Sequence, residues 1–157
     1  MRHIRFATAQ DTPQILAFIK ALAEYEHLSH EVEVDEARLR QTLFGTPPAA
    51  EVLLAFEGDT AVGFALFFHN YSTFLGKRGI YLEDLFVKPE YRGRGHGKAL
   101  LARLAALALE RGCGRLEWAV LDWNTPSIEF YKKLGAVPMS EWTIFRVTGQ
   151  ALADLAN

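Results

Sequence analysis

The sequence predicts an α+β fold in three layers, with helices on both faces of a mixed, mostly antiparallel sheet that has one central pair of parallel strands. Short β-rich runs alternate with segments whose apolar residues recur at helical spacing. One later passage runs from strand to helix to strand, which requires a parallel pairing. At 157 residues, with 50% hydrophobic and 23% charged residues, the chain can bury a sizeable core. The length gives no reason to divide it, so we expect one domain over residues 1–157.

The N-terminal half predicts a strand, two helices and a hairpin, in that order. Asp11 as a capping residue, the proline that follows and Gln14 together predict a helix start. The residues at 57–60 form a turn between two apolar runs, which predicts an antiparallel hairpin. The expected ranges are 3–7 for the strand, 12–27 and 35–44 for the helices, and 51–56 and 61–68 for the hairpin strands.

The C-terminal half predicts three strands and three helices. The strongest helix has leucines along one face and ends at two glycines, Gly112 and Gly114. The expected strands are 79–87, 115–121 and 142–147, and the expected helices are 97–111, 125–134 and a short helix at the tail.

The segment 87–98 joins a strand to the long helix and has three glycines at alternate positions. Glycines let a ligand approach the backbone closely, and free amides at a helix start favour an anion. A Walker loop needs Ser or Thr after Gly-Lys, and a dinucleotide fingerprint needs its third glycine one residue later, so neither fits. The pattern predicts a phosphate or pyrophosphate site, with a tight turn and a solvated basic surface as the alternative. The residues concerned are Arg92, Gly93, Arg94, Gly95, Gly97 and Lys98.

Composition argues against several classes of partner. A net charge of −2 argues against nucleic acid and against an anionic membrane surface. The single cysteine, Cys113, excludes an internal disulfide and favours a reducing compartment. No apolar run approaches the length of a membrane-spanning helix, so we expect a soluble, cytoplasmic protein. The histidines lack the spacing of a ligand set, so we expect no metal.

Two motifs resemble those of the GCN5-related N-acetyltransferase (GNAT) superfamily. Arg92-x-x-Gly95-x-Gly97 is similar to its Arg/Gln-x-x-Gly-x-Gly/Ala signature. Residues 124–136, Asn-Thr-Pro-Ser-Ile-Glu-Phe-Tyr-Lys-Lys-Leu-Gly-Ala, are similar to its later Asn-x-x-(Ala/Ser)-x-x-Phe-Tyr-x-x-x-Gly-Phe helix. The two occur in the superfamily's order and separation. The resemblance implies the GNAT acyl-CoA acyltransferase fold, with acetyl-CoA as cosubstrate.

Longer stretches resemble the spermidine/spermine (diamine) N-acetyltransferases and the related thialysine N-acetyltransferases. Two departures lie near the expected amine site: Phe74 stands where a tryptophan is expected, and the segment before Trp142 is shorter. This closer resemblance implies a small amine as acceptor and a homodimer. The similar stretches are residues 20–26, 62–65, 81–87 and 123–131.

The resemblance also implies how the coenzyme is held. The end of one strand should pair its main chain with the pantetheine arm, and the glycine turn should cradle the pyrophosphate. The start of the later helix should contact the arm and the adenosine side. The cofactor-binding residues are then Leu85, Phe86, Val87, Arg92, Gly93, Arg94, Gly95, His96, Gly97, Lys98, Asn124, Pro126, Ser127 and Tyr131.

The acceptor chemistry centres on two carboxylates that interrupt an apolar strand, Glu83 and Asp84. An amine arrives protonated and must lose a proton before it attacks a thioester, and a partly buried carboxylate with a raised pKa suits that step. Regular alternation would place the two side chains on opposite faces, and a structural ion pair is the alternative interpretation. By family position we assign Glu83 as general base, Asp84 to substrate or structural support, and Tyr131 as the general acid for the CoA thiolate.

We expect direct attack of the amine in a ternary complex, with a main-chain amide at 85–87 holding the oxyanion. Cys113 lies at the far end of the long helix, which argues against a covalent intermediate. Acidic and aromatic residues are the candidates for binding a cationic substrate: Tyr25, Glu26, Glu83, Asp84, Trp118 and Glu141. Three alternatives stay open: an acetyltransferase for another small amine or amino acid, a protein acetyltransferase, and a non-catalytic acyl-CoA-binding sensor of the same fold.

Overall fold

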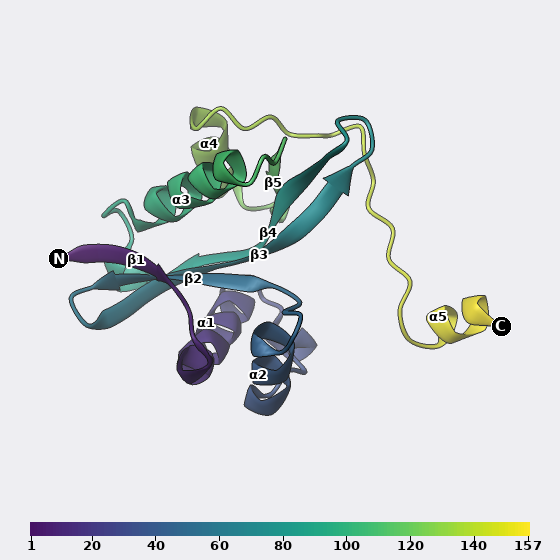
Figure 1. Cartoon of the computed structure of the whole chain (residues 1–157), viewed down its shortest axis with the longest axis horizontal. Helices are drawn as coiled ribbons and strands as arrows, with labels where there is room; N and C mark the ends of the chain where they lie inside the picture. Colours follow the sequence, from purple (N-terminus) through teal and green to yellow (C-terminus); the bar gives the residue numbers. More distant parts are fainter. The chain divides into compact units, whose positions relative to one another are not determined.

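The computed structural model describes residues 1–157 as two compact units, 1–119 and 120–157 (Figure 1). The larger unit contains the sheet and three helices, α1 (Thr12–Tyr25), α2 (Glu36–Phe44) and α3 (His96–Glu110). The smaller unit contains α4 (Thr125–Lys133) and α5 (Gly149–Ala156). No helix is both long and apolar enough to cross a membrane.

A five-stranded sheet in the order β1-β2-β3-β4-β5 forms the centre of the larger unit. The first four strands pair antiparallel with their neighbours, and β4 pairs parallel with β5. The predicted mixed, mostly antiparallel sheet is therefore confirmed, although its parallel pair lies at the end of the sheet and not at its centre. The strands are β1 (Arg2–Phe6), β2 (Glu51–Glu57), β3 (Thr60–Ser72), β4 (Lys77–Val87) and β5 (Leu116–Trp118), the last being shorter than expected.

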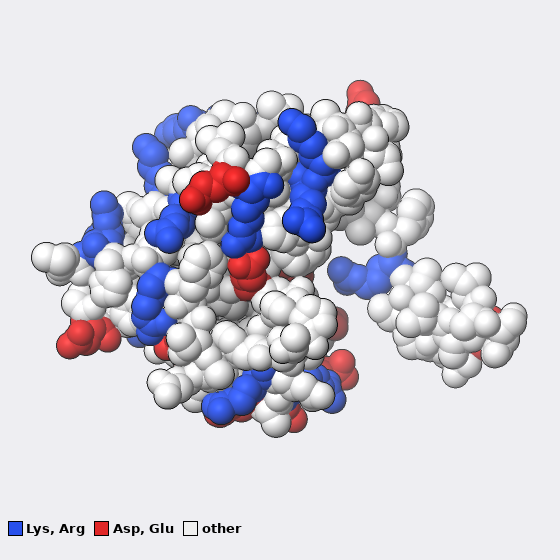
Figure 2. Space-filling view, in the orientation of Figure 1, with Lys and Arg blue, Asp and Glu red and all other residues white.

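Helices cover both faces of this sheet, which confirms the three layers. The helices α1 (Thr12–Tyr25) and α2 (Glu36–Phe44) lie on one face, and α3 (His96–Glu110) lies on the other (Figure 1). The α2 helix begins as expected, because the Asp35 side chain accepts a hydrogen bond from the Arg38 amide. Acidic and basic side chains are interspersed on the face shown in Figure 2, in keeping with the small net charge.

The core follows from apolar residues that are spaced to meet the sheet. On the α1 face, Phe18 stacks on Phe64 at 5.4 Å between ring centroids and lies 6.0 Å from the ring of Phe86. Each such buried side chain contributes about 1.5–3 kcal/mol relative to an exposed one. The α3 helix buries four leucines on the other face, so β2 and β3 are covered on both sides. These leucines are Leu100, Leu101, Leu104 and Leu107.

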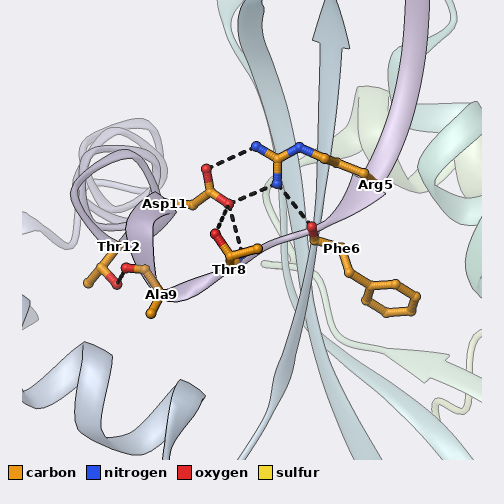
Figure 3. Close-up of polar contacts among 6 residues, drawn as sticks. All are labelled: Arg5, Phe6, Thr8, Ala9, Asp11 and Thr12. Atoms are coloured by element: carbon orange, nitrogen blue, oxygen red, sulfur yellow. Dashed lines mark hydrogen bonds and ion pairs between the residues drawn. The ribbon is translucent and has the colours of Figure 1, made fainter.

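The start of α1 differs in detail from the sequence-based expectation. The helix does begin after Asp11, but the carboxylate of Asp11 makes no cap of α1. It turns back, accepting bonds from the Thr8 amide at 2.7 Å and from both terminal nitrogens of Arg5 at 2.8 and 3.0 Å (Figure 3). Asp11 therefore ties β1 to the turn before α1, and Gln14 is not its partner in a capping box.

The smaller unit contains α4 (Thr125–Lys133) and α5 (Gly149–Ala156), both of which the sequence predicts. The expected strand at 142–147 is wrong, because this segment has no strand partner within the chain. A β-strand is stable only when its main-chain groups pair with a neighbour, and alternating apolar residues alone do not supply one.

Replacing Asp11 with alanine should lower the free energy of unfolding by about 2 kcal/mol, since a charged hydrogen-bond network is lost. The hydrogen bond from Arg5 lowers the pKa of Asp11, so its stabilising effect is complete above the unfolded value near pH 4 and disappears as the pH falls through the folded value. Urea unfolding at pH 7 and at about pH 2.5 measures both effects. Asp59→Ala, an exposed turn residue, is the control; equal effects of the two variants at pH 7 would contradict the assignment.

Candidate functional site

A β-bulge in β4 lies at the centre of the candidate site. Leu66 pairs with Asp84, and the next residue of β3, Phe67, pairs with Leu82, so Glu83 is an extra residue without a partner on β3. A bulge bends the strand and changes the direction of its side chains. The regular alternation that the sequence analysis assumed for Glu83 and Asp84 therefore does not hold here. Glu83 is exposed, whereas Asp84 is partly buried.

Three carboxyl groups influence one another around this bulge. Burial raises the pKa of Asp84 to about 7, and the negative charges of Glu83 and Glu26 add to the shift. Burial also raises the pKa of Glu26, which follows the last residue of α1, and the charge of Glu83 contributes. A carboxyl with a raised pKa suits proton transfer, and Asp84, which the sequence assigned to substrate or structural support, has such a pKa. Such a cluster favours a cation, which would relieve the repulsion between the carboxylates.

Tyr81 is a polar group near this cluster that the sequence analysis did not select. Burial raises the pKa of its hydroxyl, and the charges of Glu83 and Glu117 raise it further. Its ring packs against Phe68 with 5.3 Å between centroids. The sequence signals for Tyr81 were its position two residues before Glu83 on the same strand and its place in the similar stretch 81–87.

Beyond the bulge, β4 has one open edge. The parallel pairing with β5 covers Ile80 to Leu82 and ends at Trp118. Residues 85–87 pair with β3 on their other side, opposite residues 63–65. The main chain of Leu85, Phe86 and Val87 therefore has an edge that no strand occupies, as a bound extended chain would require.

The turn from β4 to α3 contains the glycines that the sequence singled out. Gly93 and Gly95 have φ of +80° and +87°, the left-handed region that glycine adopts without strain. The first hydrogen bond of α3 runs from the Ala99 amide to the Gly95 carbonyl, so the amides of the three residues between them have no acceptor within the helix. The turn thus presents main-chain donors at the positive end of a helix dipole.

The two arginines of this turn already have protein partners. The Nε of Arg92 donates to the Val87 carbonyl at 2.9 Å, and its guanidinium lies 5.0 Å from the centroid of the Tyr25 ring. Arg94 donates to Glu57 at 2.9 Å. His96 is buried, so this predicted cofactor-binding residue can reach a ligand only through its main chain. Lys98 is exposed.

The remaining predicted residues belong to β5 and to the smaller unit. Trp118 is partly buried at the end of β5. Asn124 caps α4, accepting a hydrogen bond from the Ser127 amide at 3.4 Å, and Pro126 lies in the first turn of that helix. Tyr131 is partly buried, with its ring 5.7 Å from that of Phe130, and Glu141 is exposed. No group of three or more His, Cys, Asp and Glu side chains is placed to hold a metal ion.

The chain is similar over nearly its whole length to known proteins. A family model described as the Acetyltransferase (GNAT) family matches residues 6–136. The thialysine N-epsilon-acetyltransferase of Bos taurus is 44% identical, over 98% of this chain and 96% of that protein. The spermidine/spermine N(1)-acetyltransferase-like protein 1 of Homo sapiens is 36% identical, over 98% of this chain and 23% of that protein. Among solved structures, an integron cassette protein from the mobile metagenome of V. cholerae aligns with a TM-score of 0.82 and 27% identity, over 99% of this chain and 97% of that one.

The carboxyl cluster predicts how Asp84 titrates. The side-chain carbon of Asp84, followed by NMR, should titrate near pH 7, and Glu83→Gln and Glu26→Gln should each lower that midpoint because each removes a neighbouring negative charge. Glu24→Gln, in the last turn of α1, should leave the midpoint unchanged. A wild-type midpoint near pH 4, or equal midpoints in all four proteins, would rule out the coupled cluster.

Proposed function

Since the chain belongs to the GNAT family and is an N-acetyltransferase, we propose that it transfers an acetyl group from acetyl-CoA to a primary amine of a small cationic substrate. A lysine-like amino acid such as thialysine, a diamine and a polyamine all have this chemistry. The observation that carries the proposal is the cluster of Glu26, Glu83 and Asp84 around the bulge of β4.

The cluster supports a cationic acceptor for an electrostatic reason. Asp84 and Glu26 are raised in pKa mainly by burial and partly by neighbouring negative charge. A substrate with one reactive amine and a second cationic group would neutralise part of that charge as it binds. A neutral monoamine offers no such compensation, so we expect it to react more slowly.

Glu83 is proposed as the general base. It is exposed at the bulge, where it can take a proton from an ammonium group directly or through water. The neutral amine then attacks the thioester carbon, the carbon–sulfur bond breaks, and the CoA thiolate takes a proton from Tyr131. The nitrogen loses its second proton as the amide forms, and a proton returns to the tyrosinate directly or through water. Asp84 is proposed to hold the ammonium group and to set the local charge.

The coenzyme is proposed to run along the open edge of β4 and over the turn at the start of α3. No strand pairs with the edge at Leu85 to Val87, although Arg92 donates to the Val87 carbonyl. This edge supports pairing with the amides of a pantetheine arm, and a main-chain amide of this stretch would hold the oxyanion. The free amides of α3 support binding of the pyrophosphate.

Because the family match, 6–136, extends across both compact units, we propose that they belong to one domain.

A homodimer is also proposed. The segment from Met139 to Val147 exposes several large apolar side chains, a surface that a second copy would remove from water. They are Met139, Trp142, Ile144, Phe145 and Val147.

Release of free CoA thiol from acetyl-CoA should be fast with thialysine, lysine, putrescine or spermidine and slow with neutral monoamines. Glu83→Gln should reduce kcat/KM by about 10²–10⁴-fold, the usual effect of losing a general base, and Tyr131→Phe should reduce kcat similarly. Glu90→Gln and Tyr71→Phe, two surface residues of the same types, are the matched controls. Equal turnover of charged and neutral amines would contradict the cationic acceptor. Coenzyme binding without turnover of any amine would favour a sensor.

Light scattering of the purified protein should give about twice the chain mass of 17.6 kDa. Phe145→Glu should shift the mass toward the monomer, because a charge would be buried in the interface. Leu109→Glu, at another exposed apolar residue, should leave the dimer intact. A monomeric wild type, or dissociation by both variants alike, would be evidence against this interface.

A further inference from the structure

The carboxylate of Glu57, at the end of β2, bridges the two residues on either side of Gly95. One oxygen accepts a hydrogen bond from Nη1 of Arg94 at 2.9 Å, and the other lies 2.6 Å from Nε2 of His96. The hydrogen bond from His96 and the charge of Arg94 lower the pKa of Glu57, so it is an ionised acceptor at neutral pH. Nε2 of His96 is then the donor.

The neighbouring strand adds a second contact to the same turn. Arg2 lies directly opposite Glu57 in the β1–β2 register, and its Nη1 donates to the main-chain carbonyl of Arg94 at 2.7 Å. The same guanidinium nitrogen lies 2.9 Å from where a side chain on Gly95 would begin. Arg94 is therefore fixed at two places, by its carbonyl and by its guanidinium.

His96 is an unusual residue to bury at this position. It is 2% exposed, and its Nδ1 has no hydrogen-bond partner. A buried polar atom without a partner costs free energy that an aliphatic side chain would not incur. The compensating interaction is the short hydrogen bond from Nε2 to Glu57, which fixes the first residue of α3 relative to β2.

These contacts determine the direction of the main chain in the turn. A trans peptide holds its C=O and N–H on opposite sides, so fixing the Arg94 carbonyl toward Arg2 directs the Gly95 amide away from it. The hydrogen bond between Glu57 and His96 fixes the first residue of α3. The row of amides that have no acceptor within the helix begins at this residue. An anion-binding turn is effective when its donors are positioned before the ligand arrives.

We propose that Arg2, Glu57 and His96 form a clamp that positions the coenzyme turn, and that the Arg94 side chain belongs to this clamp and does not contact the pyrophosphate. The three residues are positioning residues, since they act through the main chain of residues 94–98. The inference rests on the proposed function only in taking this turn as the coenzyme site.

Calorimetric binding of CoA tests the clamp without any amine substrate. Glu57→Ala should raise the Kd for CoA about tenfold, because it removes the carboxylate that accepts hydrogen bonds from both Arg94 and His96. Glu51→Ala is the matched control, because Glu51 lies at the other end of β2, is about as exposed as Glu57 and forms an ion pair with Arg111 at 2.8 Å. It should change the Kd less than twofold.

Steady-state kinetics separates positioning from a general loss of structure. In Glu57→Ala, KM for acetyl-CoA should rise by the same factor as the Kd, while kcat and KM for the amine stay within about twofold of wild type. His96→Leu keeps the buried volume and removes the hydrogen bond, and it should raise KM for acetyl-CoA as well. In a protein that already has His96→Leu, Glu57→Ala should raise KM for acetyl-CoA by a smaller factor than in the wild type, because the hydrogen bond between Glu57 and His96 is already lost.

The outcomes distinguish the clamp from the proposed function. If wild type binds CoA and Glu57→Ala binds it as tightly as Glu51→Ala does, the clamp is wrong and the function stands. If Glu57→Ala lowers kcat and raises both KM values alike, the residue has only a structural role and the clamp is again wrong. If the wild type binds no CoA, the coenzyme assignment and the clamp fail together.

Discussion

The antiparallel pairing of β3 with β4 runs from Gly63 opposite Val87 to Ser72 opposite Lys77, and it skips a single residue, Glu83. That insertion divides β4 into two parts. Just before it, residues 80–82 are paired on both edges, with β3 and with β5; after it, only the β3 edge is paired. The same residue therefore brings a carboxylate to the surface and marks where the edge of the sheet becomes available. Both features of the candidate site depend on one local change of register.

The carboxyl cluster lowers the stability of the fold, and a catalytic role would explain why it is kept. The pKa of Asp84 in the folded protein is about 7, above its unfolded value near 4, so the folded state binds more protons between these values. Stability therefore falls as the pH rises from about 4 to about 7, and the deficit persists above that. A chain that only needed a stable sheet would have an apolar residue here. Under the proposed function, a bound ammonium group offsets this deficit and is itself held by the charge that causes it.

In the turn at the start of α3, side chains stabilise the main chain, and main-chain amides are available to bind an anion. Arg92 donates to the Val87 carbonyl and stacks on Tyr25, and Arg94 donates to Glu57. Each of the two arginines therefore stabilises the turn through contacts with the rest of the protein. The main-chain amides at the start of α3 are left as the donors toward an anion. Basic residues around a glycine turn thus have two possible roles, and the partners seen here favour support over direct contact. The proposed clamp extends this support to β1 and β2.

The sequence by itself determined the order of the helices and of the five strands of the sheet, the hairpin, the glycine turn and the family, because these depend on residue spacing along one segment. It also indicated Glu83 and Asp84, two charges in an apolar strand. Only the tertiary structure decided that the pKa of Asp84 is raised, since burial and the charge of Glu26 come from another element. The tertiary structure also decided the role of His96, which the resemblance assigned to coenzyme binding and which the fold buries against Glu57. It likewise decided that residues 142–147 form no strand, because their strand-like spacing meets no partner strand. Register, burial and pairing depend on residues far apart in the chain, and a local pattern does not contain them.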